Sequence, residues 1–121
     1  MQREGSPGVD AVGEEVLRAY VAIQKLVANE GRLRILVALS KGPRTWSELM
    51  FESRINPKSL RDNLELLIES GLVQKEGTAY SSTDAGLALT SMSLTQMVET
   101  AKFATTAASI GATRESRKKA Q

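Results

Sequence analysis

The sequence predicts a mainly α-helical fold with one small β-hairpin, and three observations lead to this class. Hydrophobic residues make up 41% of the 121 residues but aromatic residues only 4%, so the core must consist mostly of aliphatic side chains. Over most of the chain, apolar residues recur at three- and four-residue steps, which is the period of an α-helix. Residues 72–82 roughly alternate between apolar and polar instead, which is the period of a β-strand.

The first predicted helix spans residues 9–28. Its apolar residues recur at helical spacing and form one seam: Val9, Val12, Val16, Ala19, Ile23 and Leu26. Residues 1–8 precede it and are polar, with two glycines and a proline, so we expect a disordered lead-in there. The sequence Asn-Glu-Gly at residues 29–31 is expected to break this helix.

A second, short and mostly buried helix is predicted over residues 32–40. Its start carries Arg32 and Arg34, and the sequence Lys-Gly-Pro-Arg at residues 41–44 ends it. Four residues share one face and are expected to point into the core: Leu33, Leu36, Val37 and Ser40.

The third helix is predicted over residues 46–53, with Thr45 or Ser47 as its N-cap. Glu48 lies three residues after Thr45, which is the spacing that a capping box requires. The inner face would consist of three residues: Trp46, Leu49 and Met50.

The fourth helix is predicted to begin at Pro57 and to end near Ser70. Asn56 can serve as its N-cap, and proline is well tolerated at the first helical position. Gly71 can adopt the left-handed conformation that closes a helix. Four residues at helical spacing form the inward stripe: Leu60, Leu64, Leu67 and Ile68.

A two-stranded hairpin is predicted after the fourth helix, with its tight turn at residues 76–78. A hairpin this short needs a helical partner to be stable. A long closing helix should supply it, because the chain contains neither proline nor a run of charges from Asp84 to about Ile110. Thr83 or Asp84 can cap this helix, and Gly86 weakens its first turn. Residues 111–121 are expected to form a basic flexible tail.

The order of these elements is that of a helix-turn-helix followed by a wing. Only residues 54–56 separate the third and fourth helices, and the hairpin follows directly. In this motif the N-terminal part of the second helix enters the major groove of double-stranded DNA. We therefore predict a winged helix-turn-helix domain over residues 9–110 that binds double-stranded DNA, with a recognition helix at about residues 57–70.

Basic and small polar residues occupy the front of the predicted recognition helix. Arg61 is the best candidate to read bases, because a guanidinium can form two hydrogen bonds with guanine. Lys58 at the helix entrance is better placed for a phosphate. Six residues are predicted to contact DNA: Arg44, Arg54, Lys58, Ser59, Arg61 and Lys75. The alternative for Lys58 and Arg61 is an ordinary solvated helix face. The formal net charge is only +2, so the distribution of cations supports this prediction rather than their number.

Three stretches resemble the winged helix-turn-helix regulators of the ArsR and MarR type, especially archaeal members. They are NEGRLRILVAL, WSELMFESRINPKSLRDNLELLIESGLV and AYSSTDAG, and together they cover about residues 29–90. The last contains a Y-x-x-T-x-x-G pattern, here Tyr80, Thr83 and Gly86, which joins the wing to the closing helix in that family. The resemblance implies a homodimeric transcription regulator.

The chain contains no cysteine and no histidine. The cysteine and histidine ligands of ArsR-type metal sensors are therefore missing, and imidazole catalysis is excluded. We expect neither an enzyme nor a metal or cofactor site, and no residue demands a small-molecule effector. No apolar run approaches the roughly 20 residues that span a bilayer. The expected location is the cytoplasm, without membrane association.

The closing helix carries more apolar surface than its own domain can cover, and the first helix offers a matching seam. We predict that the two helices pack against each other within one chain and that those of two chains also form a symmetric bundle, which is the dimer interface. The predicted interface residues are Val12, Val16, Ile23, Leu94, Val98, Ala101, Ala104 and Ala108. Two other functions stay open: a sequence-neutral architectural DNA-binding protein, and a winged-helix module that binds other proteins.

Overall fold

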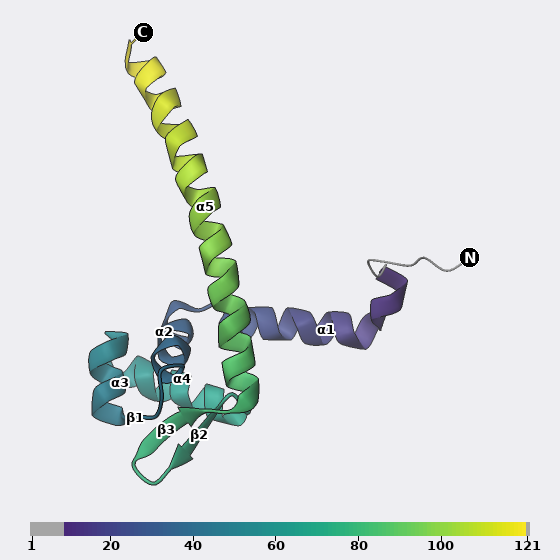
Figure 1. Ribbon diagram of the computed structural model, residues 1–121, viewed down its shortest axis with the longest axis vertical. Coiled ribbons are helices and arrows are strands. Elements are labelled where there is room, and N and C mark those ends of the chain that lie inside the picture. Colours follow the sequence, from purple (N-terminus) through teal and green to yellow (C-terminus); the bar gives the residue numbers. More distant parts are fainter. Residues whose placement is uncertain (1–8, 121) are drawn as a thin grey trace.

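The computed structural model describes the backbone of residues 9–120 and the side chains of residues 12–108. The elements in chain order are α1 (Val9–Val27), α2 (Glu30–Leu39), β1 (Arg44–Thr45), α3 (Trp46–Ser53), α4 (Pro57–Glu69), β2 (Val73–Glu76), β3 (Ala79–Ser82) and α5 (Asp84–Ala120). The short helices and the sheet pack into one body, from which α1 and α5 project in different directions (Figure 1). This arrangement confirms the predicted fold class, mainly helical with a small β-hairpin. The predicted lead-in, residues 1–8, lies outside the described residues.

Side-chain caps fix the start of α3. The Thr45 hydroxyl accepts a hydrogen bond from the Glu48 amide at 3.3 Å, and the Glu48 carboxylate accepts one from the Thr45 amide at 2.9 Å. The predicted capping box is therefore confirmed, with Thr45 rather than Ser47 as the cap. The hydrogen bond from the Thr45 amide is the main reason that the pKa of Glu48 lies below its usual value of 4.5, and the Thr45 hydroxyl and the positive charge of Arg44 lower it further.

The hydrophobic core lies around α2, which α3, α4 and α5 all contact. The buried residues of α2 are Ile35, Leu36, Ala38 and Leu39. The predicted inner face was therefore largely wrong: Leu36 is buried, but Leu33 and Val37 are half-buried and Ser40 is exposed. A helix with neighbours on several sides buries a wider face than one apolar stripe, so periodicity alone could not orient it.

The predicted break between the first two helices is confirmed, but it is shorter than expected, because α2 begins at Glu30 rather than at Arg32. The Asn29 side chain accepts a hydrogen bond from the Arg32 amide at 2.9 Å, so Asn29 is the N-cap and α2 starts at Glu30. In α1 the backbone of Gly13 departs from helical geometry, with φ of 78°, and this produces a kink. None of the described helices is long and apolar enough to cross a membrane.

The predictions for α4 are confirmed at both ends. It begins at Pro57 after the Asn56 cap, and Gly71 follows its end with a left-handed φ of 76°. Its inward stripe consists of three buried residues: Leu60, Leu64 and Leu67. Ile68 was expected to join them but is 38% exposed, because it lies at the edge of the stripe.

The sheet has three strands in the order β1-β3-β2, one more than the predicted hairpin. The two residues of β1 pair with Ala79 and Tyr80 of β3, and a two-residue strand is too short to give a sequence signal. The hairpin itself is confirmed. Glu76 pairs with Ala79, so Gly77 and Thr78 form the turn, and Gly77 has a φ of 62° that favours glycine.

Thr83 and Gly86 attach α5 to the hairpin. The Thr83 hydroxyl accepts a hydrogen bond from the Gly86 amide at 3.1 Å and donates one to the Gly71 carbonyl at 2.6 Å. A Cβ atom on Gly86 would lie 2.1 Å from the Leu72 carbonyl oxygen, so glycine permits this close approach. The helix continues to Ala120, well beyond the end predicted near Ile110. Residues 111–120 contain several good helix formers, and cations near the C-terminus favour a helix.

Candidate nucleic-acid interface

The first turn of α4 lies at the surface of the helix-turn-helix. Asn56 caps the helix by accepting a hydrogen bond from the Ser59 amide at 2.8 Å. Lys58 is exposed and Ser59 is half-buried. Pro57 has no N–H, and the Ser59 and Leu60 amides both donate to Asn56, so the Lys58 amide is the one in this turn that can meet a phosphate.

The two cations of α4, Lys58 and Arg61, both lie in its first half and are exposed. Neither has an ion-pair partner among the side chains of residues 12–108. The acidic residues of α4 are also exposed: Asp62, Glu65 and Glu69. Because carboxylates repel phosphates, only the front of α4 is electrostatically suited to a DNA groove.

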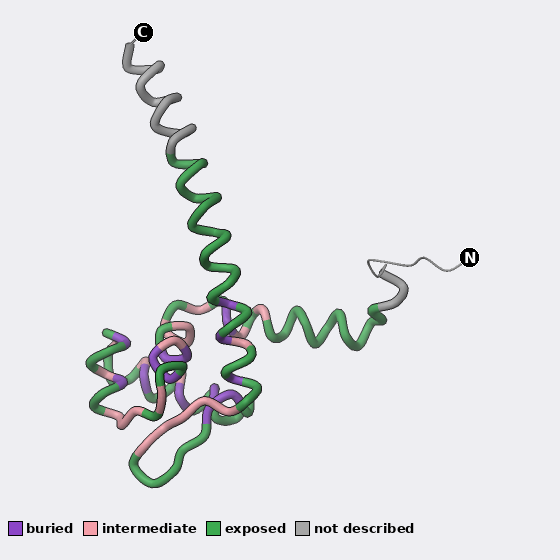
Figure 2. The backbone as a smooth tube through the Cα atoms, viewed as in Figure 1, coloured by how far each residue is buried: buried purple, intermediate pink, exposed green. Residues whose placement is uncertain are grey.

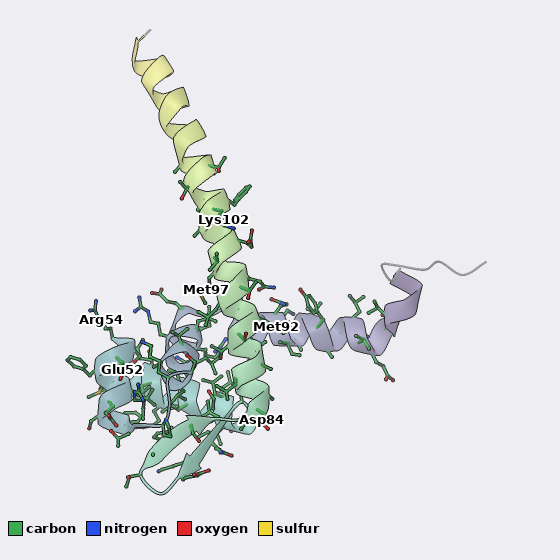
Figure 3. All side chains as sticks on the ribbon, viewed as in Figure 1. Glu52, Arg54, Asp84, Met92, Met97 and Lys102 are labelled. Atoms are coloured by element: carbon green, nitrogen blue, oxygen red, sulfur yellow. The ribbon has the colours of Figure 1, made fainter. Side chains whose placement is uncertain are left out.

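Arg54 ends α3 in the left-handed conformation, with φ of 57°, which is uncommon for a residue other than glycine. Its side chain is exposed and points outward from the body (Figure 3). Arg54 and Ser59 line one depression of about 430 Å³, together with Asn56 and Asn63. The structure thus brings two of the six predicted DNA contacts together at the front of α4.

Arg44 is engaged within the protein. Its guanidinium pairs with Glu52 at 2.8 Å and also donates hydrogen bonds to the carbonyl oxygens of Gly42 and Pro43, at 3.2 and 2.9 Å. The side chain is only 20% exposed. Of the six predicted contacts, Arg44 is therefore the one least available to a phosphate. Sequence reasoning missed the pairing because it depends on the packing of β1 against α3.

Lys75 lies on the wing, where its ammonium is 5.5 Å from the centre of the Tyr80 ring. The two residues are cross-strand partners in β2 and β3. A cation over an aromatic face is attracted to the ring. Lys75 is nevertheless exposed, so its charge stays accessible on this short wing.

Asn63 and Arg32 are positioning residues that sequence reasoning did not identify. The Arg32 guanidinium donates hydrogen bonds to the Asn63 side chain at 3.3 Å and to the Leu26 carbonyl at 2.5 Å. Gly31 lies against the same amide, since a Cβ atom there would be 2.8 Å from Asn63 Nδ2. This network joins the end of α1, the start of α2 and the recognition helix. No local pattern could reveal it, because Arg32 and Asn63 are far apart in the sequence.

The predicted dimer residues all lie on the exposed parts of α1 and α5 (Figure 2). The two helices leave the body in different directions (Figure 1), so the arrangement does not support packing between them within one chain. Large apolar side chains therefore face solvent along both helices: Val12, Val16, Leu17, Tyr20, Val21 and Ile23 of α1, and Leu87, Met92, Leu94, Met97, Val98 and Phe103 of α5.

The helix pair α3 and α4, the sheet and α5 define a winged helix-turn-helix, a fold class found in DNA-binding regulators. Residues 29–75 match the family model described as "Bacterial regulatory protein, arsR family". The part of the chain that carries the helix pair and the first wing strand is thus similar to ArsR-family regulators. No curated protein matches the chain.

Solved structures share the fold over most of their length. The quinone-bound YodB from B. subtilis is 20% identical, with a TM-score of 0.67 over 70% of this chain and 98% of its own. The transcriptional repressor BigR from Xylella fastidiosa is 22% identical, with a TM-score of 0.63 over 71% and 90%. The homodimeric DNA-binding domain of Mb0332 from Mycobacterium bovis, a possible ArsR-family transcriptional regulator, is 25% identical, with a TM-score of 0.56 over 84% and 94%. The predicted resemblance of this chain to archaeal members of the ArsR and MarR type stays a prediction.

Proposed function

We propose that the protein is a cytoplasmic transcription regulator that binds double-stranded DNA as a homodimer, with α4 in the major groove. The observation that carries this proposal is the front of α4. There, exposed Lys58 and Arg61 have no ion-pair partners among the described side chains, and they lie on the first turns of a capped helix. Such a surface combines phosphate contacts with base contacts, which sequence-specific binding requires.

Each candidate residue has a distinct role in this proposal. Arg61 and Ser59 read base edges, because they lie on the first turns of α4. Lys58 and Arg54 hold phosphates on either side of the helix entrance, and Lys75 contacts the backbone from the wing. The acidic rear half of α4 keeps the rest of the helix away from the DNA backbone.

The homodimer is supported by the unpartnered apolar side chains of α1 and α5. An exposed apolar surface along two projecting helices is typical of an interface rather than of a monomer. The homodimeric Mb0332 domain, which has the same fold, adds support. Two-fold symmetry would separate the two recognition helices by about one DNA turn, roughly 34 Å, or a multiple of it. The binding site is then a pseudo-palindrome.

The test is selection of binding sites from a random duplex library at near-physiological salt, with the mass of the protein measured in solution. Enrichment of a two-fold symmetric site by a dimer would support the proposal. Binding without enrichment would indicate a sequence-neutral architectural protein instead. No binding even at low salt would favour a winged-helix module that binds other proteins.

Single substitutions separate base reading from phosphate binding. Arg61→Ala should cost about 1–3 kcal/mol on the selected site and relax the preference there, whereas Lys58→Ala should weaken all sequences alike and reduce the salt slope by about 1. Lys102→Ala is a matched control, because this lysine lies on α5 and pairs with Glu99 (Figure 3). Equal losses on every sequence for the Arg61 and Lys58 variants would contradict the assigned roles.

A further inference from the structure

The first helix carries two apolar stripes rather than one. Successive helical residues are about 100° apart around the axis, which places Val16 and Ile23 together in the predicted dimer seam. We define a second stripe by three residues: Leu17, Tyr20 and Val21. Leu17 and Val21 lie about 100° and 140° around the axis from Val16, and Tyr20, at about 40°, joins them to the seam. These side chains are 46%, 52% and 43% exposed. An apolar surface this wide exceeds one helical stripe, and the predicted seam accounts for only part of it.

An unfilled apolar groove lies between α2, α3 and α5, and we call it the α2–α3 groove. Its volume is about 1030 Å³. The apolar lining consists of Leu33, Val37, Ala38, Phe51 and Met97. Phe51 is 85% exposed, and leaving so large an aromatic side chain in water forfeits its burial energy. Figure 3 shows Met97 on the side of α5 that faces α2 and α3.

The rim of the α2–α3 groove has an excess of positive charge. Two of its cations are paired, Arg34 with Glu30 at 2.7 Å and Arg44 with Glu52 at 2.8 Å. The other two lining cations, Lys41 and Arg54, have no acidic partner among the described side chains. The groove therefore suits an apolar segment that carries negative charge.

The chain cannot fill this groove with its own first helix. The hydrogen bond from Arg32 to the Leu26 carbonyl and the Asn29 cap hold the junction between α1 and α2. From this junction α1 projects away from the body (Figure 1). The occupant must therefore come from another molecule, and a second copy of the chain can supply such a helix.

Charge distinguishes the two helices that a second copy could insert. After the first turn of α5, its described side chains include one carboxylate, Glu99, which pairs with Lys102 at 3.3 Å, so this stretch has no carboxylate left for a positive rim. The first part of α1 is acidic, and Glu14 borders the second stripe at helical spacing. Glu14 is exposed, and its contact with Arg18 is long, at 4.0 Å, so its carboxylate is available to a cation such as Lys41.

We propose that the α2–α3 groove binds the second stripe of α1 from a second copy of this chain. The inference rests on the proposed homodimer and extends it, because the interface then includes α3 and its exposed Phe51 in addition to α1 and α5. The partner chain thereby contacts α3, the first helix of the helix-turn-helix. Dimerisation therefore also supports the recognition helix α4 on the side away from the DNA.

The absence of cysteine makes disulfide cross-linking a direct test of this contact. The variant with Val21→Cys and Phe51→Cys should form covalent dimers on mild oxidation. The corresponding single variants are controls, as is a pair with Val21→Cys and Glu76→Cys, because Glu76 lies at the exposed turn of the wing. The pair Val16→Cys and Val98→Cys reports the predicted seam independently.

The outcomes separate this inference from the proposed function. Covalent dimers of the Val21/Phe51 pair well above all its controls would support the groove. Dimers of the Val16/Val98 pair alone would overturn the groove and leave the homodimer in place. No cross-link in any pair would overturn the groove as well. A monomeric mass in solution would in addition overturn the proposed homodimer. DNA binding, measured separately, would test the other part of the proposed function, which is recognition of double-stranded DNA.

A second measurement uses Phe51 without cysteine chemistry. Phe51→Ser should raise the dimer dissociation constant at least tenfold, because an aromatic anchor at a protein interface is commonly a hot spot. The fold should be unaffected, as circular dichroism would confirm, since this side chain is already in solvent in the single chain. Leu66→Ser is the control, because Leu66 is also exposed but lies on α4 outside the groove. An unchanged dissociation constant for Phe51→Ser would overturn the inference.

Discussion

Gly86→Ala should destabilise the protein, although helix propensity alone predicts the opposite. Alanine is favoured over glycine in a helix by about 1 kcal/mol. At this position, however, the new Cβ atom would lie 2.1 Å from the Leu72 carbonyl oxygen. Cβ atoms in proteins essentially never come within 3.0 Å of such an atom, so α5 or the connection between α4 and β2 must move by nearly 1 Å.

The cost of this movement exceeds the gain in propensity. The shift strains the hydrogen bond from the Thr83 amide to the Leu72 carbonyl, which is 3.1 Å, and the one from the Thr83 hydroxyl to Gly71. Overpacking costs about 1–3 kcal/mol, and each hydrogen bond contributes about 1 kcal/mol. We expect a net destabilisation of about 1–3 kcal/mol, with a fall in Tm of roughly 4–8 °C for each kcal/mol.

The assay is denaturant and thermal unfolding at a fixed protein concentration, since dimerisation makes stability concentration-dependent. Ala88→Gly, at an exposed site of α5, measures the propensity difference alone. A Gly86→Ala protein as stable as the wild type, or more stable, would refute the steric reasoning.

Three further outcomes follow from individual side chains. Glu48→Gln should reduce stability near neutral pH, and this difference should shrink as the pH falls below 4.5, because a carboxylate with a lowered pKa stabilises the fold only while it is ionised. Unfolding curves of both proteins across this pH range would check it. Arg44→Ala should weaken DNA binding less than Lys58→Ala, as titration with the selected duplex would reveal, because Glu52 already engages Arg44. Leu64→Ala, at a position only 2% exposed, should cost about 2–5 kcal/mol in a denaturant titration, and a much smaller loss would contradict the packing around α4.

The parts of the fold that the sequence predicted well depend on local interactions. The capping box at Thr45, the Asn56-Pro57 start of α4 and the left-handed Gly71 involve residues within a few positions of one another. Such signals can be recognised from the sequence alone, because one short segment forms the whole interaction. The order of the helix pair and the hairpin then gave the winged helix-turn-helix.

The parts that were missed depend on contacts between distant segments. The strand β1 exists only because its two residues pair with β3, and the buried face of α2 is set by the four helices that contact it. The ion pair of Arg44 with Glu52 depends on such a contact too, because it forms only after β1 and α3 pack together. This pair engages a side chain that was predicted to contact a phosphate. The sequence predicted only that Gly86 weakens the helix, whereas the reason for a glycine there required the position of the Leu72 carbonyl.

The orientation of the recognition helix is not independent of the first helix. Arg32 donates hydrogen bonds to the Leu26 carbonyl, at the end of α1, and to the side chain of Asn63 in α4. Gly31 lies against the same amide, which restricts the space in which Asn63 can move. A change in the direction of α1 must therefore break these contacts or displace α4 with them. In the proposed dimer α1 belongs to the interface, so the same network would relate the geometry of that interface to the spacing of the two recognition helices on DNA.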